Sequence, residues 1–200
     1  MSAPSVLVLA CGALARELLA VVEANGLDRV RVEFLPAQLH NRPETIPEAV
    51  GEALDRLAPG HDRVLLGYGD CGTGGALDRL CAERGVERLP GAHCYEFFAG
   101  PDLFERLHTA EPGTFYLTDY LVRHFDRLVL DGLGINQHPE LEPLYFGHYR
   151  TLVHLAQVDD PELRARAEAA AERLGLAFEY HLVGMGGLAT TVVEVAARHG

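Results

Sequence analysis

The sequence predicts an α/β fold, a three-layer sandwich built on a mostly parallel sheet. Short apolar runs, which are typical of buried strands, alternate along the chain with segments of helical periodicity. Glycine-containing turns follow several of these runs, as they do at the carboxyl ends of parallel strands. A length of 200 residues with 48% hydrophobic residues is enough for one sizeable core. We therefore expect residues 1–200 to form a single α/β domain.

The first half of the chain predicts three strands, each followed by a helix. In order, we expect a strand at 6–10, a helix from Leu14 to Asn25, a strand at 30–35, a helix from Thr45 to about Ala58, a strand at 63–69 and a helix ending at Gly85. Thr45 and Glu48 have the spacing of a capping box. Cys11-Gly12 and Cys71-Gly72 each stand between a strand and a helix, which suggests a repeated strand–Cys–Gly–helix unit.

The second half continues the alternation. We expect strands at 86–89, 114–118, 127–130, 152–157 and 178–183, a helix at 161–174 and a closing helix after Gly187. Asp160 before Pro161 predicts the start of the first of these helices, and Gly175 predicts its end. The polar and aromatic stretch 132–150 predicts a lid loop over a small ligand.

Composition excludes several classes of function. The net charge of −12 argues against a nucleic-acid partner, because a phosphate backbone would be repelled. All 17 basic residues are arginine, which excludes Schiff-base enzymes and the P-loop lysine. The only serines are Ser2 and Ser5, so a serine-hydrolase elbow has no nucleophile. No apolar run is long enough to span a bilayer, and we expect a cytoplasmic protein without a membrane partner.

Three of the four cysteines are candidate metal ligands. Cys11, Cys71 and Cys94 lie in turns that the alternation places after strands, so the carboxyl edge of the sheet would collect them. Three converging thiolates repel one another, and a cation relieves that repulsion. Such a set leaves one position open, as in catalytic Zn²⁺ or a [4Fe–4S] cluster with one free iron. The alternative is three ordinary turn or core cysteines, and Cys81, on the apolar helical face of Leu77, is expected to be buried.

Three further residues are candidates for catalysis at the same edge. His40, in the polar loop 39–43, could be a fourth ligand, a proton donor or an anion contact, or simply a solvated loop histidine. Asp70 could act as an acid or base beside Tyr68, and His93 could contact the substrate. A structural role is the alternative for each of them.

Four glycines are candidates for cofactor binding through their backbone N–H groups. Gly12 and Gly72 follow the two cysteines, whereas Gly186 and Gly187 precede the last helix and could cradle a phosphate or carboxylate. The run 184–187 is not a complete GxGxxG motif, and tight packing is the alternative explanation.

The chain resembles an uncharacterised bacterial and archaeal family of unknown function, whose members are often encoded beside corrinoid-dependent methyltransferases. The resemblance covers most of the chain, and the segments that carry it are 10–14, 39–43, 67–72, 93–94 and 112–118. It implies that Cys11, His40, Cys71 and the cysteine near position 94 match recurring polar residues of the family. Relatives place an extra residue between the equivalents of His93 and Cys94, and often asparagine at the position of Thr73.

Three hypotheses of function follow. The first is a metalloenzyme in which Cys11, Cys71 and Cys94 bind Zn²⁺ and activate a small-molecule thiol or water. The second places an iron–sulfur cluster on the same cysteines. The third is a non-catalytic accessory module that binds a small molecule or a component of a corrinoid methyltransferase. The resemblance connects all three with methyl-group or one-carbon metabolism.

Overall fold

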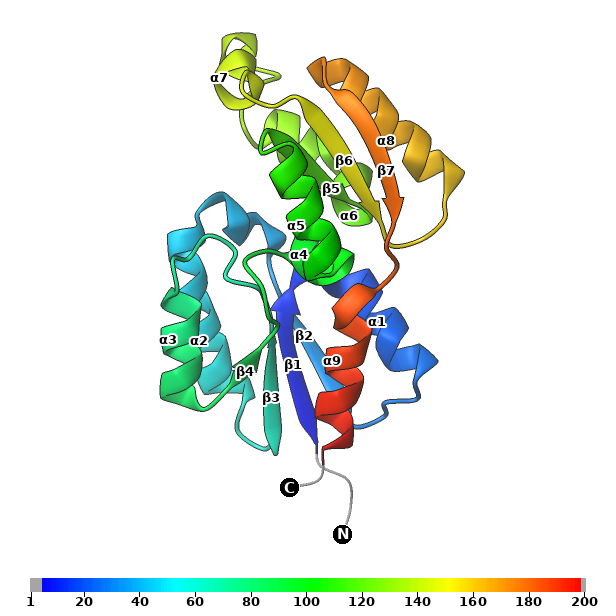
Figure 1. The fold of residues 1–200 in the computed structure, drawn as a ribbon. Helices are drawn as coiled ribbons and strands as arrows, with labels where there is room; N and C mark the ends of the chain where they lie inside the picture. The colour runs from blue at the N-terminus through cyan, green and yellow to red at the C-terminus, as the bar shows by residue number, and fades with distance from the viewer. Residues whose placement is uncertain (1–4, 199–200) are drawn as a thin grey trace. The chain divides into compact units, whose positions relative to one another are not determined.

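The structure is a computed structural model, and it describes residues 5–198. Its α/β architecture confirms the predicted fold class, with parallel strands interleaved with helices. The chain divides into two compact units, where the sequence predicts one domain with one sheet. Unit 1 comprises residues 5–97 and 185–198, and unit 2 comprises residues 98–184. Each unit has its own parallel sheet (Figure 1).

Unit 1 contains a four-stranded parallel sheet in the order β2-β1-β3-β4. The strands are β1 (Val6–Cys11), β2 (Val30–Leu35), β3 (Arg63–Gly67) and β4 (Glu87–Arg88). Helices α1 (Ala15–Ala24) and α9 (Gly186–Ala197) pack together on one face, and α2 (Ile46–Leu57) and α3 (Ala76–Arg84) on the other (Figure 1). Every residue of β1 is buried because this central strand is covered on both faces.

Short helices connect these elements near the carboxyl ends of the strands. They are η1 (Gly12–Leu14), η2 (Ala37–Asn41), η3 (Pro43–Thr45) and α4 (Cys94–Ala99). The predicted capping box at Thr45 and Glu48 is absent, because the Thr45 hydroxyl instead donates to the Arg42 carbonyl at 2.8 Å. Gly85 ends α3 in the left-handed conformation, as predicted.

Unit 2 contains a three-stranded parallel sheet in the order β5-β6-β7. Its elements are α5 (Pro101–Ala110), β5 (Thr114–Thr118), α6 (Asp119–Arg123), η4 (Asp126–Asp131), η5 (Pro139–Leu141), α7 (Glu142–Phe146), β6 (Thr151–Ala156), α8 (Pro161–Leu174) and β7 (Ala177–Leu182). Asp160 caps α8 by accepting hydrogen bonds from the N–H groups of Glu162 and Leu163, and Gly175 ends it. Both ends of this helix confirm the sequence prediction.

The predicted strand at 127–130 is wrong. This segment lies in the π-helix η4, whose Val129 and Leu130 are buried in the core of unit 2 with α8 residues such as Ala170. A short apolar run has the same hydropathy in a buried strand and in a buried helical turn, so periodicity could not separate them. The segment expected as a lid, 132–150, contains η5 and α7 and buries Ile135 and Phe146 in the same core.

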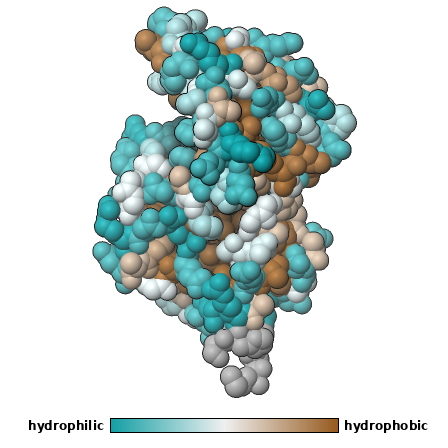
Figure 2. Space-filling model, in the orientation of Figure 1, coloured by the Kyte–Doolittle hydropathy of each residue, from teal (hydrophilic) through white to brown (hydrophobic). Residues whose placement is uncertain are grey.

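The exposed large hydrophobic residues that the structure describes are spread over several parts of the chain. Figure 2 shows one face of the molecule, on which hydrophilic residues predominate and hydrophobic ones form separate patches. The large hydrophobic side chains that are most exposed are Leu19 on α1, Leu144 and Tyr145 on α7, Val158 in the loop after β6 and Leu182 on β7. Scattered exposure of this kind is ordinary. None of the helices in the described part of the chain has the length and hydropathy needed to cross a membrane.

The close packing of β1 against β3 predicts the effect of a methyl group at Gly67. A Cβ atom there would lie 2.5 Å from the Cβ atom of Ala10, its register partner on β1. We therefore expect Gly67→Ala to lower the free energy of unfolding by about 2 kcal/mol in urea denaturation. Gly51→Ala is the control, because a Cβ atom in this helical position would meet only Leu80 Cδ1, at 3.9 Å. It should raise the same quantity by roughly 0.5 kcal/mol. Equal effects of both substitutions would contradict the account of this contact.

Candidate functional site

The carboxyl edge of the sheet in unit 1 gathers most of the predicted site residues. Cys11 is the last residue of β1, and Tyr68 directly follows β3. Because Ala10 pairs with Gly67 in parallel register, Cys11 and Tyr68 come next to each other where the two strands end. Ligand sites of parallel α/β sheets lie at this edge.

Cys11 is buried and its thiol has two close neighbours. Its Sγ atom accepts a hydrogen bond from the Ala13 N–H at 3.3 Å, which caps η1. The same Sγ atom lies 3.7 Å from Nδ1 of His40. Burial raises the pKa of this thiol from 9.0 to about 11, despite the opposing effect of the Ala13 hydrogen bond. At neutral pH the Cys11 side chain is therefore a thiol and not a thiolate.

His40 is oriented by the backbone of η2. Its Nδ1 atom lies 3.2 Å from the Ala37 carbonyl oxygen, which can only accept a hydrogen bond. This contact assigns the hydrogen to Nδ1 and leaves Nε2 with a lone pair in the neutral ring. Burial is the largest cause of the lowered pKa of His40, and the charge of His93 lowers it further. The imidazole stacks on Tyr68, with ring centroids 5.9 Å apart.

The loops after β3 and β4 meet at a pair of backbone hydrogen bonds. The Asp70 N–H donates to the Gly91 carbonyl at 3.1 Å, and the Cys71 N–H donates to the Ala92 carbonyl at 2.8 Å. Gly69 permits this approach, since a Cβ atom there would lie only 3.1 Å from the Gly91 carbonyl oxygen. Cys71 itself has φ of 51°, in the left-handed region that non-glycine residues rarely adopt. Such strain costs about 1–2 kcal/mol and tends to occur at functional sites.

The thiols of Cys71 and Cys94 lie within the electrostatic field of Cys11. Burial raises the pKa of Cys71 to about 12, and charge on Cys11 adds to this effect. Burial is also the largest cause of the raised pKa of the Cys94 thiol, followed by charge on Cys71 and on Cys11. The residue Cys94, at the start of α4, is half-buried as a whole. The three thiols thus act on one another electrostatically, and their predicted convergence on one ion stays a prediction.

Cys81 is separate from these three thiols. It is buried on α3, as predicted, and the charges that act on it are those of Arg88 and Asp78.

Tyr68 contributes a buried hydroxyl to this edge of the sheet. The sequence predicted Tyr68 only as a neighbour of Asp70. The side chain is 1% exposed, and its hydroxyl lies beside the Cys11 thiol. No hydrogen bond of normal geometry satisfies this oxygen among the residues that the structure describes. Burial is the largest cause of its raised pKa, followed by charge on Cys11 and Cys71. A buried hydroxyl without a well-formed hydrogen bond costs roughly 1–3 kcal/mol, and the interaction with the Cys11 thiol offsets only part of this cost.

Asp70 has a structural task within its own loop. Its carboxylate accepts hydrogen bonds from the Thr73 hydroxyl at 2.8 Å and from the N–H groups of Gly74 and Gly75. Desolvation raises its pKa, but these hydrogen bonds outweigh that effect and lower the pKa overall. The role of Asp70 as an acid or base stays a prediction, and the geometry accounts for the residue as the organiser of the turn that carries Cys71.

The remaining predicted residues lie around the same loops or at the start of α9. His93 stands next to Cys94, and its charge acts on His40. A Cβ atom at Gly12 would lie 3.1 Å from the Leu35 carbonyl oxygen, and one at Gly72 would lie 3.4 Å from the side chain of Pro43. Both glycines therefore let the chain that carries His40 approach the strand ends. Gly186 and Gly187 are the first residues of α9. Their predicted contact with a cofactor stays a prediction.

The thiols and imidazoles do not form an assembled coordination sphere. Among residues 5–198, no group of three His, Cys, Asp or Glu side chains has the arrangement that would hold one metal ion. Any ion would have to draw these side chains closer together.

Unit 2 carries a buried polar cluster that the sequence did not reveal. Asp119 and His154 are each 1% exposed, and Oδ1 of Asp119 lies 2.9 Å from Nε2 of His154. Oδ2 of Asp119 accepts from the Val158 N–H, and the Asp119 N–H donates to the Gln157 side chain. The buried Nδ1 atom of His154 has no hydrogen-bond partner within the described chain. This cluster connects the start of α6 with the end of β6.

Comparison with known proteins places the chain in a family. The family described as "Protein of unknown function (DUF1638)" matches residues 34–192. The chain belongs to this family. The match includes His40, Cys71, Cys94 and all of unit 2, whereas Cys11 precedes it. No curated protein matches the chain. Since the DUF1638 description leaves function open, function has to be argued from the site itself.

The raised pKa values of the thiols predict how stability depends on pH. Cys11 and Cys71 keep their protons in the folded protein above pH 9, where unfolded cysteines lose theirs. The folded state then binds more protons, so its free energy of unfolding should fall as the pH rises from about 9 towards 11. The expected slope is about 1.4 kcal/mol per pH unit for each thiol.

Urea denaturation of metal-free, reduced protein measures this slope. In the Cys71→Ser variant this slope should be smaller than in the unmutated chain by about 1.4 kcal/mol per pH unit, the contribution of one thiol, since serine does not titrate in this range. An unfolding free energy that stays constant or rises across this interval would show that the thiols are not desolvated.

Proposed function

We propose that unit 1 binds Zn²⁺ through Cys11, Cys71 and Cys94 and uses the ion to activate a small-molecule thiol or water. The observation that carries this proposal is that Cys11, Cys71 and Cys94 all lie at the carboxyl ends of the strands of unit 1 or in the loops that follow them, where charge on Cys71 and Cys11 raises the pKa of the Cys94 thiol. Three sulfur ligands with one open position are a set that suits catalytic zinc. A bound Zn²⁺ would strongly lower the pKa of a thiol or water molecule in the open position.

The electrostatics of the thiols support a cation at this edge. Each thiolate would be poorly solvated there, and each would raise the free energy of forming the next. A divalent cation reverses both effects, because it neutralises two of the three negative charges where water does not reach them. The thiols remain neutral without the ion and lose their protons when it binds.

The tautomer of His40 supports its role as a fourth ligand or as a proton carrier. The nitrogen that lies 3.7 Å from Cys11 Sγ is the protonated Nδ1, so Nε2 would reach the ion after the ring turns. Metal-binding histidines commonly donate one ring N–H to a backbone carbonyl, which orients the ring and leaves the other nitrogen free. The Nδ1 contact with the Ala37 carbonyl has this form, and the lowered pKa keeps the ring neutral at pH 7. A neutral imidazole can bind a metal ion or accept a proton from the group being activated.

Tyr68 supports a substrate position beside the thiols. Its buried hydroxyl faces Cys11 without a hydrogen bond of normal geometry in the described residues. A substrate oxygen, or a water molecule held for attack, would satisfy it. Binding the ion requires the thiols to rotate towards one another, because the described side chains are not yet arranged around one centre. His93 would then act on the proton from the rim of this site, and Asp70 would do so after its carboxylate releases the N–H group of Gly74 or Gly75.

We propose a place in one-carbon metabolism for this site, with a component of a corrinoid methyltransferase as partner. The support for this part is the resemblance to a family associated with such methyltransferases, which the segments 10–14, 39–43, 67–72, 93–94 and 112–118 carry. A small thiol that accepts a methyl group is a substrate class compatible with a zinc–thiolate centre, since zinc stabilises the reactive thiolate at neutral pH.

Titration calorimetry of the reduced, metal-free full chain with ZnCl₂ tests the metal site. We expect saturation at one equivalent and release of about three protons near pH 7, measured in buffers of different ionisation enthalpy. Cys11→Ser, Cys71→Ser and Cys94→Ser should each weaken binding by roughly 100-fold or more. Cys81→Ser is the matched control and should leave affinity unchanged, because Cys81 lies apart from the three thiols.

Melting temperatures of the metal-free variants separate loss of ligands from loss of fold. The proposal fails if zinc does not saturate the folded protein, or if the Cys81→Ser variant loses as much affinity as the others. A brown preparation that contains acid-labile sulfide, and loses it when any of the same three cysteines is replaced, would show that these residues bind an iron–sulfur cluster and not zinc. Unchanged binding of small molecules in all three serine variants, without any metal, would instead favour the accessory module.

A further inference from the structure

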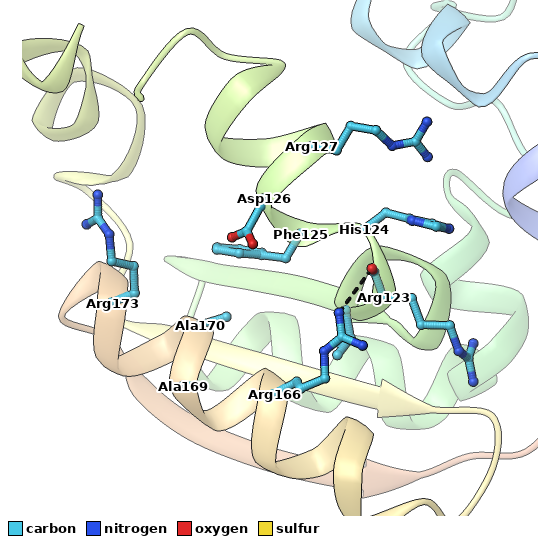
Figure 3. A pocket seen from close by; sticks show the side chains of 10 residues that line it. Arg123, His124, Phe125, Asp126, Arg127, Arg166, Ala169, Ala170 and Arg173 are labelled. Carbon is cyan, nitrogen blue, oxygen red and sulfur yellow. Dashed lines mark hydrogen bonds between the residues drawn. The ribbon is translucent and has the colours of Figure 1, made fainter. Parts of the chain in front are cut away.

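A pocket of about 420 Å³ lies in unit 2, between α8 and the segment that runs from α6 into η4. Figure 3 shows its lining, with Arg166 and Arg173 on α8 and Arg123, His124 and Arg127 on the opposite wall. Its volume falls within the range of small-molecule sites, which begins at about 300 Å³. All ten lining residues belong to unit 2, so this pocket is separate from the thiols of unit 1.

The charge of this pocket is opposite to that of the chain. Four arginines line it against one acidic residue, Asp126, although the whole chain carries a net charge of −12. Burial and the charges of Arg127, Arg123 and Arg166 lower the pKa of His124, so all three guanidinium groups act on this one ring. A concentration of positive charge in an acidic protein focuses its field on anions.

Some of these arginines are fixed and others are free. Arg123 lies 3.9 Å from the buried carboxylate of Asp119, and its carbonyl accepts a hydrogen bond from Arg166 at 3.1 Å (Figure 3). At the other end of the pocket, Arg173 is paired with Glu142. Arg127 makes no ion pair or hydrogen bond to any residue in the described part of the chain, and its side chain is exposed. Arg166 has donors to spare after its single hydrogen bond.

The backbone that carries this wall is irregular. The π-helix η4 begins two residues after His124, and the Leu128 N–H donates to the His124 carbonyl at 2.8 Å. π-Helical turns are uncommon and occur often at functional sites. Here the turn places Arg123, His124 and Arg127 along one side of the pocket.

We propose that this pocket binds an organic phosphate, with the dianionic phosphate on Arg166 and on Arg127. The exposed side chain of Arg127 extends away from Arg166 in Figure 3 and turns towards the ligand on binding. Guanidinium groups bind phosphate through two parallel hydrogen bonds, and both arginines have donors that no protein acceptor uses. Phe125, Ala169 and Ala170 provide an apolar wall for the rest of the ligand. The pocket is larger than a phosphate ion needs, which favours an ester over the inorganic ion. This proposal is independent of zinc binding in unit 1.

Titration of the full chain with phenyl phosphate, inorganic phosphate and benzoate tests the proposal by calorimetry and by the NMR signals of the His124 ring. Phenyl phosphate should bind saturably, more tightly than inorganic phosphate because of the apolar wall, and more tightly than benzoate because of its second charge. Added salt should weaken its binding. Arg127→Gln and Arg166→Gln should each weaken it by roughly tenfold, the loss of one charge-assisted contact.

Arg106→Gln is the matched control, since it removes the same charge from an exposed position on α5 of the same unit. The affinity of this variant for phenyl phosphate should stay within about twofold of that of the unmutated chain, because salt screens exposed charges that lie at a distance. The proposal is overturned if phenyl phosphate does not saturate the protein, if Arg106→Gln weakens binding as much as Arg127→Gln, or if benzoate binds as well as phenyl phosphate. Arg127 is exposed, so its substitution should leave the fold and its melting temperature intact.

Discussion

The candidate site depends on two backbone hydrogen bonds between loops that are distant along the chain. By donating to the carbonyls of Gly91 and Ala92, the N–H groups of Asp70 and Cys71 hold the loop before α4 against the end of β3. Glycine at position 69 lets the two backbones come this close. Parallel pairing of β1 with β3 brings Cys11 and Tyr68 together, pairing of β3 with β4 brings the following loop to the same edge, and these two hydrogen bonds fix the residues just before Cys94. Loop closure over such a separation is an entropic cost that only a specific contact offsets.

The sequence predicted the fold class and most of the strands because their signals are local. The buried run at β1, the cap and stop at Asp160 and Gly175, and the left-handed glycine at 85 each depend on a few neighbouring residues. The division into two sheets could not be predicted in this way, since pairing between distant strands leaves no periodicity in either strand. The strand predicted at 127–130 lies within the π-helix at 126–131 for a related reason, because only packing distinguishes a short buried strand from a buried helical turn.

The residues of the candidate site could likewise be predicted where the signal is local, and could not where it depends on contacts between distant segments. The sequence placed Cys11, Cys71 and Cys94 after strands, and the structure places them at the carboxyl ends of the strands of unit 1 or in the loops that follow. The orphaned hydroxyl of Tyr68 and the carbonyl contact of His40 depend on side-chain packing, which the sequence does not specify. The arginine pocket of unit 2 had a partial signal, because Arg123 and Arg127 are four residues apart. The opposite wall on α8 comes from a segment about forty residues away, so only the fold joins the two.

The two units thus present chemically opposite environments within one acidic chain. Unit 1 has neutral, desolvated thiols that gain charge when a cation binds, whereas unit 2 has permanent positive charge that an anion would neutralise. X-ray absorption of the zinc-loaded protein tests the proposed thiol site most directly. Three sulfur neighbours of zinc at about 2.3 Å are expected, with one lighter atom completing the tetrahedron. A zinc ion surrounded only by nitrogen and oxygen would contradict this expectation.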